Sequence, residues 1–218
     1  MSFTPLTDNR PDDSSWPPMV WPLPPGVEAR AGAVRLTPFT PADADELFEA
    51  LDHDAVWAHV PGRFSDPRQL TDSITQRMDA RGDVAWVVRL DEAVAGLEKD
   101  AVVGTTSFLD VVPASARLEI GWTAYTPAVW GTRVNPSAKL ALLTVAFDQL
   151  GVGRVQLKTD VRNQRSQRAI AKLGARFEGV LRRYQPRVDG SMRDTVMFSI
   201  TTEDWPAVSS GLQDRLSS

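Results

Sequence analysis

The loop before one strongly apolar segment contains residues suited to binding an anion. Asn135 is a favourable helix N-cap, and Pro136 suits the first position of a helix that Gly151 would end. The free N–H groups at such a helix end, together with the helix dipole, favour a phosphate or pyrophosphate. Arg133 adds a positive charge inside the loop. An ordinary capped helix without a ligand explains the loop equally well.

Glu119 is a carboxylate inside an otherwise apolar strand, residues 117–125. Because side chains alternate across a strand, Leu118 and Ile120 point to one face and Glu119 points to the other. We expect that face to be either solvent or a wet site. Gly121, two residues later, permits a bulge or the close approach of a ligand.

Asn163 and Ser166 precede a short helix, and Asn-x-x-Ser at that place is typical of a plain helix cap. The surrounding segment 162–193 holds nine Lys or Arg residues and only two acidic ones. Such a basic segment suits phosphate groups or an acidic protein or RNA surface. A solvated protein face explains it equally well.

The composition excludes several other chemistries. The chain has 218 residues, no cysteine and two histidines, His53 and His59, which we expect to line a substrate pocket. Without cysteine there is no disulfide, thiolate ligand or cysteine nucleophile, and two histidines cannot make a three-histidine zinc site, so we expect no metal. The net charge of −4 argues against nucleic-acid binding. No apolar run reaches the ~18 residues of a membrane span and no signal peptide is evident, so we expect a cytoplasmic protein.

Hydrophobic periodicity predicts an α/β domain with seven strands and four helices. The expected strands are residues 34–39, 85–90, 102–111, 117–125, 154–159, 176–184 and 193–200. The expected helices are residues 42–52, 67–82, 135–150 and 166–174. Helices between strands imply a mixed sheet covered on both faces, with a right-handed crossover from strand 117–125 to strand 154–159. Ligands are then expected at the loop 126–135, beyond the C-terminal end of its strand.

The first 28 residues differ in composition from the rest. Seven of the sixteen prolines lie there, which excludes a regular helix or a central strand. The sequence therefore predicts a proline-rich arm over residues 1–28 and a domain over residues 29–218. The second half of the arm is apolar and is expected to lie against the domain.

Four stretches of the chain together resemble a known enzyme superfamily. They are LEIGWTAY (118–125), WGTRVNPSAKLALLTVAFDQLG (130–151), VQLKTDVRNQRSQRAIAKLGARFEGVLR (155–182) and RDTVMFSITTEDW (193–205). They are similar to the GNAT superfamily of acetyl-CoA-dependent N-acetyltransferases, and most similar to the RimJ/RimL-type branch that acetylates ribosomal-protein N-termini. The resemblance covers about residues 33–205. It implies the GNAT fold, a mixed, mostly antiparallel seven-stranded sheet with helices on both faces and a split between the central parallel strands.

The resemblance also implies roles for particular side chains. Glu119 would act as general base, directly or through water, because an α-amino group with a pKa near ~8 must lose a proton before it attacks. Ser166 would stabilise the departing CoA thiolate through a hydrogen bond. Asn163 would hydrogen-bond the pantetheine arm of CoA.

The remaining contacts to acetyl-CoA would come from backbone and basic groups. N–H groups near Trp122, Thr123 and Ala124 would bind the thioester carbonyl oxygen. The residues expected to cradle the diphosphate are Trp130, Gly131, Thr132, Arg133, Val134 and Asn135. Further phosphate partners would be Arg162, Arg165 and Arg168. The loop departs from the family pattern, because Trp130 stands where Arg or Gln is usual, and Arg133 and Asn135 stand where glycine or alanine is usual.

The implied function is direct acetyl transfer from acetyl-CoA to a primary amine, most directly a protein or peptide N-terminus. A small amine, such as an amino acid or an antibiotic, is the alternative acceptor. A non-catalytic member of the fold that binds CoA or a partner protein, and a nucleic-acid-binding module, are the alternatives outside enzymes. The resemblance also allows a homodimer, with the apolar arm packed across it.

Overall fold

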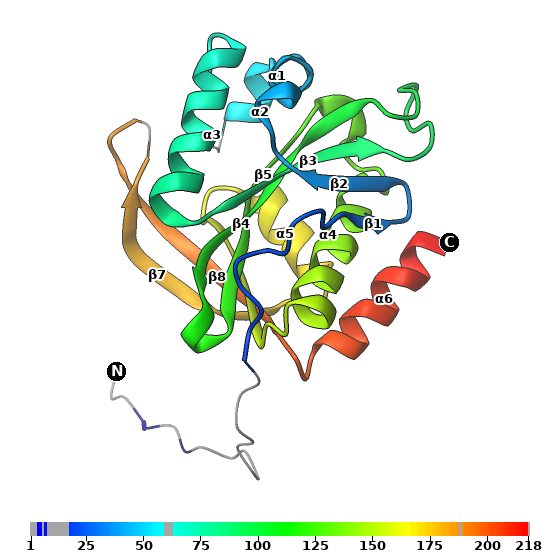
Figure 1. Ribbon diagram of the computed structural model, residues 1–218. Coiled ribbons are helices and arrows are strands. Elements are labelled where there is room, and N and C mark those ends of the chain that lie inside the picture. Colours follow the sequence, from blue (N-terminus) through cyan, green and yellow to red (C-terminus); the bar gives the residue numbers. More distant parts are fainter. Residues whose placement is uncertain (1–3, 6, 8–17, 59–62, 188, 218) are drawn as a thin grey trace.

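The computed structural model describes residues 4–5, 7, 18–58, 63–187 and 189–217. Eight strands form one sheet in the order β1-β2-β3-β4-β5-β6-β8-β7 (Figure 1). Their bounds are β1 Ala29–Ala31, β2 Val34–Pro38, β3 Val84–Leu90, β4 Val102–Val112, β5 Arg117–Tyr125, β6 Arg154–Asp160, β7 Arg176–Pro186 and β8 Met192–Thr201. The prediction of seven strands therefore misses one strand, β1. Its three residues are too few to show a hydrophobic period. The mixed α/β fold itself is confirmed.

Helices cover both faces of the sheet, as predicted. Their bounds are α1 Ala44–Leu51, α2 Asp54–Trp57, α3 Pro67–Arg81, α4 Val134–Thr144, α5 Gln164–Ala171 and α6 Trp205–Ser217. Helices α4, α5 and α6 bury their apolar side chains in one core cluster, and α1, α2 and α3 bury theirs in a second cluster on the opposite face. Within the described residues no helix is both long and apolar enough to cross a membrane.

Two neighbouring strands separate in the middle of the sheet. Strands β5 and β6 pair in parallel only from Arg117 to Glu119, which face Arg154 to Gln156, and the other strand pairs of the described sheet are antiparallel. Beyond Glu119 both strands continue without pairing to each other. The connection between them runs through α4, so the sheet contains the predicted crossover and the predicted split.

Helix α4 begins earlier than the sequence predicts. It starts at Val134 with Arg133 as N-cap, so the prediction of Asn135 as N-cap and Pro136 as first helical residue is wrong. The Ser137 N–H already donates to the Arg133 carbonyl at 3.0 Å. Pro136 is tolerated because its missing N–H falls in the first turn, where no intrahelical bond would use it. A π-helical turn, Val145–Gln149, extends α4 to the predicted end near Gly151.

Helix α6 and the described part of the N-terminal arm complete the core. Helix α6 is not among the helices predicted from the sequence, although Trp205, Val208 and Leu212 recur at helical spacing and are buried. From residue 18 onward the arm lies against its own chain, and the Val20 N–H donates to the Leu150 carbonyl at 2.8 Å. The apolar residues of this segment thus pack on the domain itself.

Candidate active site

A cavity of about 810 Å³ occupies the split between β5 and β6. One end is lined by α2 and α3, and the other by the loop before α4 and the first turn of α5. The predicted residues that line it are Glu119, Trp122, Thr123, Ala124, Trp130, Gly131, Asn135, Asn163, Arg165 and Ser166. The split thus brings together segments that lie far apart in the sequence, because a crossover connection separates β5 from β6.

Glu119 lies at the last paired position of β5, where the two strands part. Its side chain is buried, with the residue only 3% exposed, so the expected alternative of a solvated face is wrong. Burial raises the pKa of Glu119, and the Lys158 ammonium on β6, 2.6 Å from the carboxylate, opposes that rise. Burial alone would lower the pKa of Lys158, but the Glu119 carboxylate raises it. The pair bridges the apex of the split.

The backbone of β5 is distorted just beyond Glu119. The register against β4 shifts between Thr105 and Ser107, and Trp122 has a φ of 50°, so the bulge predicted at Gly121 occurs one residue later. Gly121 has a different role. A Cβ there would lie 2.6 Å from Glu119 Oε1, so only glycine leaves room for that carboxylate.

The loop before α4 divides into residues that face the cavity and residues that do not. Trp130, Gly131 and Asn135 line the cavity, and Gly131 has a φ of 78° with open space where a Cβ would stand. Three other predicted contacts turn away from it. The Thr132 hydroxyl donates to the Val129 carbonyl at 2.7 Å, Arg133 pairs with Glu92 at 3.0 Å, and Val134 is buried. Arg133 therefore does not provide the positive charge that its sequence position indicates.

Arg165 provides a positive charge at this end of the cavity. Its guanidinium lies 3.9 Å from the centroid of the Trp130 ring, and the Trp130 indole N–H donates to the Tyr125 carbonyl at 3.0 Å. The tryptophan in place of the usual Arg or Gln thus supports an arginine from α5. The other two arginines of the predicted set do not line the cavity. Arg162 pairs with Asp189 at 3.7 Å, and Arg168 donates to Gln164 at 3.0 Å.

Asn163 and Ser166 are brought together at the start of α5. The Asn163 side-chain oxygen accepts a hydrogen bond from the Ser166 N–H at 3.0 Å, so the capping role is present. The Asn163 amide NH2 and the Ser166 hydroxyl have no hydrogen-bond partner within the described part of the chain. Both residues line the cavity, so these donors are available to a ligand.

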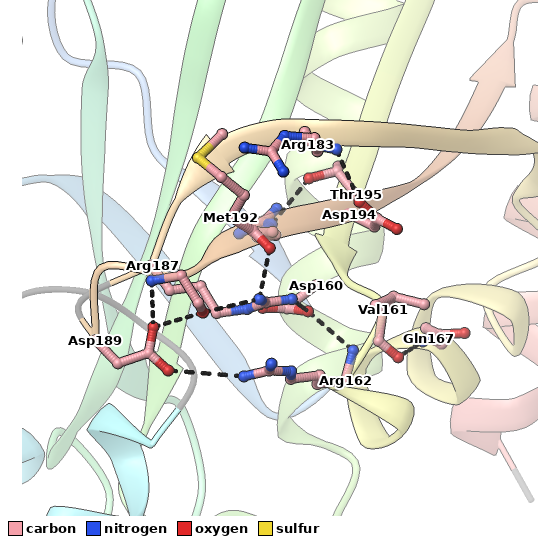
Figure 2. Close-up of polar contacts among 12 residues, drawn as sticks. Asp160, Val161, Arg162, Gln167, Arg183, Arg187, Asp189, Met192, Asp194 and Thr195 are labelled. Atoms are coloured by element: carbon pink, nitrogen blue, oxygen red, sulfur yellow. Dashed lines mark hydrogen bonds and ion pairs between the residues drawn. The ribbon is translucent and has the colours of Figure 1, made fainter.

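A network around Asp160 holds this segment in place (Figure 2). Arg187, at the tip of the β7–β8 hairpin, contacts both carboxylate oxygens of Asp160, at 2.5 and 2.9 Å. The same carboxylate accepts a hydrogen bond from the Arg162 N–H at 2.9 Å. Its contact with Arg187 lowers the pKa of Asp160 to about 2. The network joins the hairpin to the turn that carries Asn163.

Lys139 on α4 is a buried cation that the sequence analysis misses. It lines the cavity and is 5% exposed, and its ammonium donates to the hydroxyls of Thr123 at 2.7 Å and Thr106 at 3.1 Å. Burial lowers the pKa of Lys139 to about 7. The sequence contains a signal for this buried cation, because Lys139 lies between Ala138 and Leu140 in an apolar helix, where an exposed side chain is not expected.

Trp122 lines the cavity at the α2 and α3 end, and two aromatic side chains outside the lining pack against it. Trp122 contacts Trp57 and Phe64, with 6.2 Å between ring centroids in each case. Trp86, by contrast, is fully buried in the core. Of the two histidines, His53 does not line the cavity, and His59 lies outside the described residues. Among the described residues no group of three or more His, Cys, Asp or Glu side chains is arranged to hold a metal ion.

Comparisons with known proteins agree with this fold. The acetyltransferase (GNAT) domain family matches residues 33–176. The uncharacterized N-acetyltransferase YoaA of Bacillus subtilis is 24% identical over 169 residues, which cover 76% of this chain and 91% of YoaA. A crystal structure of an inferred acetyltransferase from T. thermophilus is 33% identical, with a TM-score of 0.76 and coverage of 90% of this chain and 100% of that one.

A third protein, whose structure holds a form of CoA, has the same fold. Mycobacterium smegmatis RimJ in complex with CoA-disulfide superposes with a TM-score of 0.69 at 22% identity, covering 87% of this chain and 93% of RimJ. At that identity the likeness concerns the fold alone. The family match spans well over half of the chain, from just before β2 to the first residue of β7. The chain therefore belongs to the GNAT family of acetyltransferases and is an N-acetyltransferase enzyme.

Proposed function

We propose that the enzyme transfers an acetyl group from acetyl-CoA to a primary amine by direct attack, with Glu119 as the base. The observation that carries this proposal is the position of Glu119, which is buried at the apex of the split between β5 and β6 and lines the cavity. Burial raises the pKa of Glu119 and so makes the carboxylate a better proton acceptor.

The cavity also has the groups that the other parts of the reaction require. Glu119 accepts the proton of the ammonium group, and the neutral amine then attacks the acetyl carbonyl. The backbone N–H groups of β5 at Trp122–Ala124 stabilise the charge that develops on the carbonyl oxygen. The C–N bond forms and the C–S bond breaks. The Ser166 hydroxyl donates a hydrogen bond to the departing thiolate, which takes up the second excess proton of the nitrogen and leaves as the thiol of CoA.

Acetyl-CoA fits the residues at the α4 and α5 end. Gly131 leaves open space beside the N–H groups of the first turn of α4, which suits a diphosphate. Arg165 supplies positive charge, and the Asn163 amide supplies a donor for the pantetheine arm. RimJ, which shares this fold, is known in complex with CoA-disulfide, and this supports CoA as the ligand.

A protein or peptide N-terminus is the first candidate for the acceptor. Its support is the similarity of the motifs to the RimJ/RimL-type branch, together with the fold shared with RimJ. A small primary amine is the second candidate. The Trp122 ring in the cavity wall, packed against Trp57 and Phe64, favours it, because an aromatic wall suits a compact acceptor.

The base is tested by the variant Glu119→Gln, which keeps the shape of the side chain but cannot accept the proton. We expect kcat to fall by about 10²-fold or more, with an unchanged dissociation constant for acetyl-CoA. Asp110→Asn is the matched control, because Asp110 also lines the cavity but is exposed and pairs with Arg117. Equal turnover by Glu119→Gln and Asp110→Asn would remove Glu119 from the mechanism.

We also propose that two copies of the chain associate. The support is the apolar surface of the edge strand β7. Its exposed apolar side chains are Phe177, Val180, Leu181 and Tyr184. Such a patch on an edge strand favours contact with another protein surface. Sedimentation equilibrium checks this proposal, and a strictly monomeric protein at micromolar concentration would contradict it.

A further inference from the structure

Arg77 is a cation at the end of the cavity that acetyl-CoA does not need. It lies on α3, which packs on the opposite face of the sheet from α4 and α5, and it lines the cavity together with Val56 and Arg81. Its guanidinium carbon is 3.8 Å from the centroid of the Trp122 ring. An arginine stacked in this way keeps its N–H groups in one plane, with their edge free for a ligand.

The described residues leave the hydrogen-bonding capacity of Arg77 unused. Its Nε is buried and has no hydrogen-bond partner among the described residues. No carboxylate of the described residues forms an ion pair with Arg77 within 4.0 Å, although Asp83 attracts it at longer range. The Asp83 carboxylate instead accepts a hydrogen bond from the Asp110 backbone, and burial raises the pKa of Asp83.

A partly buried guanidinium without an ion-pair partner is unfavourable unless a ligand completes it. Burial lowers the pKa of Arg77, which shows that the surroundings disfavour its charge. A bound carboxylate matches the planar guanidinium with two parallel hydrogen bonds. Asp83, Asp110 and Glu119 line the same region and would repel a doubly charged phosphate more strongly than a single carboxylate.

Arg77 and Glu119 line the same cavity and contact neighbouring positions of β5. The Oε1 atom of Glu119 lies close to Gly121. The Arg77 guanidinium stacks on the ring of the next residue, Trp122. Both charged groups therefore contact one short stretch of strand. A molecule that meets both carries an amine and a carboxylate at once.

We infer that the acceptor carries a carboxylate in addition to its reactive amine, and that Arg77 binds this carboxylate while the amine faces Glu119. The inference rests on the proposed acetyl transfer and names the acceptor class for it. A free amino acid and a peptide with an acidic N-terminal residue share this chemistry. Arg77 is thus a specificity-determining residue, and its removal should affect acceptor binding more than the chemical step.

The test compares matched acceptors at saturating acetyl-CoA. One arm uses free amino acids against their amides, and the other uses peptides that begin with Asp or Glu against peptides that begin with Asn or Gln. In at least one arm we expect the wild-type enzyme to favour the carboxylate by about tenfold or more in kcat/KM. The arm with the preference identifies the source of the carboxylate.

The variant Arg77→Met should abolish that preference through a higher KM for the carboxylate, while the amide or the neutral peptide keeps its kcat/KM. Arg77→Lys should restore part of it, because a lysine keeps the charge but not the paired hydrogen bonds. Arg68→Met is the control on the same helix, since Arg68 does not line the cavity. Thermal unfolding of each variant checks that it folds.

The outcomes separate this inference from the proposed function. If the wild-type enzyme acetylates carboxylates and amides equally, or if Arg77→Met retains the preference, the inference is wrong and the transfer mechanism stands. If Glu119→Gln keeps full turnover, the proposed base is wrong whatever the acceptor preference. If no amine in either arm is acetylated, the proposed function fails and the inference fails with it.

Discussion

At the scale of single residues, the reactivity of the site depends on how burial and charge act on one carboxylate. Burial of Glu119 favours its protonated form, and Lys158 favours the ionised form that can accept a proton. Burial has the larger effect, so the pKa of Glu119 lies above its usual range. The rate should therefore fall as the pH drops through this raised pKa.

The variant Lys158→Met tests that balance. This variant removes the ammonium that opposes the effect of burial on the Glu119 carboxylate, so the pKa of Glu119 should rise further. The acid limb of kcat/KM against pH should then move to higher pH, with the activity at alkaline pH largely kept. Lys158→Arg keeps the charge and should leave the limb near its wild-type position. An acid limb that stays in place in Lys158→Met would contradict this account.

At the scale of elements, the turn that carries Asn163 and the start of α5 are held in place from two sides. Asp160 and Arg187 connect this turn to the β7–β8 hairpin, and Arg165 reaches from α5 to Trp130 in the loop before α4. The two segments that would hold CoA are therefore in contact before any ligand binds. Trp130 takes part in this contact, which accounts for a tryptophan where the family commonly has Arg or Gln.

Arg165→Ala should weaken CoA binding, because it removes the cation that lies over Trp130 at the diphosphate end of the cavity. We expect the dissociation constant measured by calorimetry to rise by about tenfold, with a smaller effect at high salt. Arg168→Ala is the matched control from the same helix, and its side chain does not line the cavity. If Arg168→Ala weakened binding as much as Arg165→Ala, the sequence-based prediction for Arg168 would hold and the assignment to Arg165 would not.

At the scale of the whole molecule, a charged group inside the core makes stability depend on pH. Lys139 has a folded-state pKa of about 7, below its usual value of 10.5. Between these two values the unfolded chain binds the proton more readily than the folded chain does. The free energy of unfolding should therefore rise as the pH rises from about 7 toward about 10, and the full penalty should apply below pH 7.

Lys139→Met should remove this dependence and stabilise the protein at pH 6 by roughly 3–5 kcal/mol. Urea unfolding at pH 6, 7.5 and 9 measures the difference, and Lys172→Met, at an exposed position of the chain, is the control. Equal pH dependence in Lys139→Met and the wild-type protein would show that Lys139 is not a strained buried cation. A lower kcat in Lys139→Met would in addition connect its contact with Thr123 to the bulge of β5.

Local patterns in the chain suffice to predict the order of most strands and helices, the crossover around α4 and the identity of the main chemical groups. Alternation places Glu119 off the apolar face, and Asn-x-x-Ser starts a helix. The family is also predictable, because the motifs of β5, α4 and α5 are continuous in the chain. Such patterns do not predict the short strand β1 or the start of α4. Pairing to β2 determines β1, and the hydrogen bonds of the preceding turn determine where α4 begins.

Which groups act together depends instead on contacts made through space. Lys158 meets Glu119, Arg165 meets Trp130 and Arg77 meets Trp122, and in each pair the partners lie on different elements. The pKa values follow the same rule, because they depend on burial and on neighbours that the folded chain brings close. The sequence thus specifies the reacting groups, and the parting of β5 from β6 specifies their surroundings.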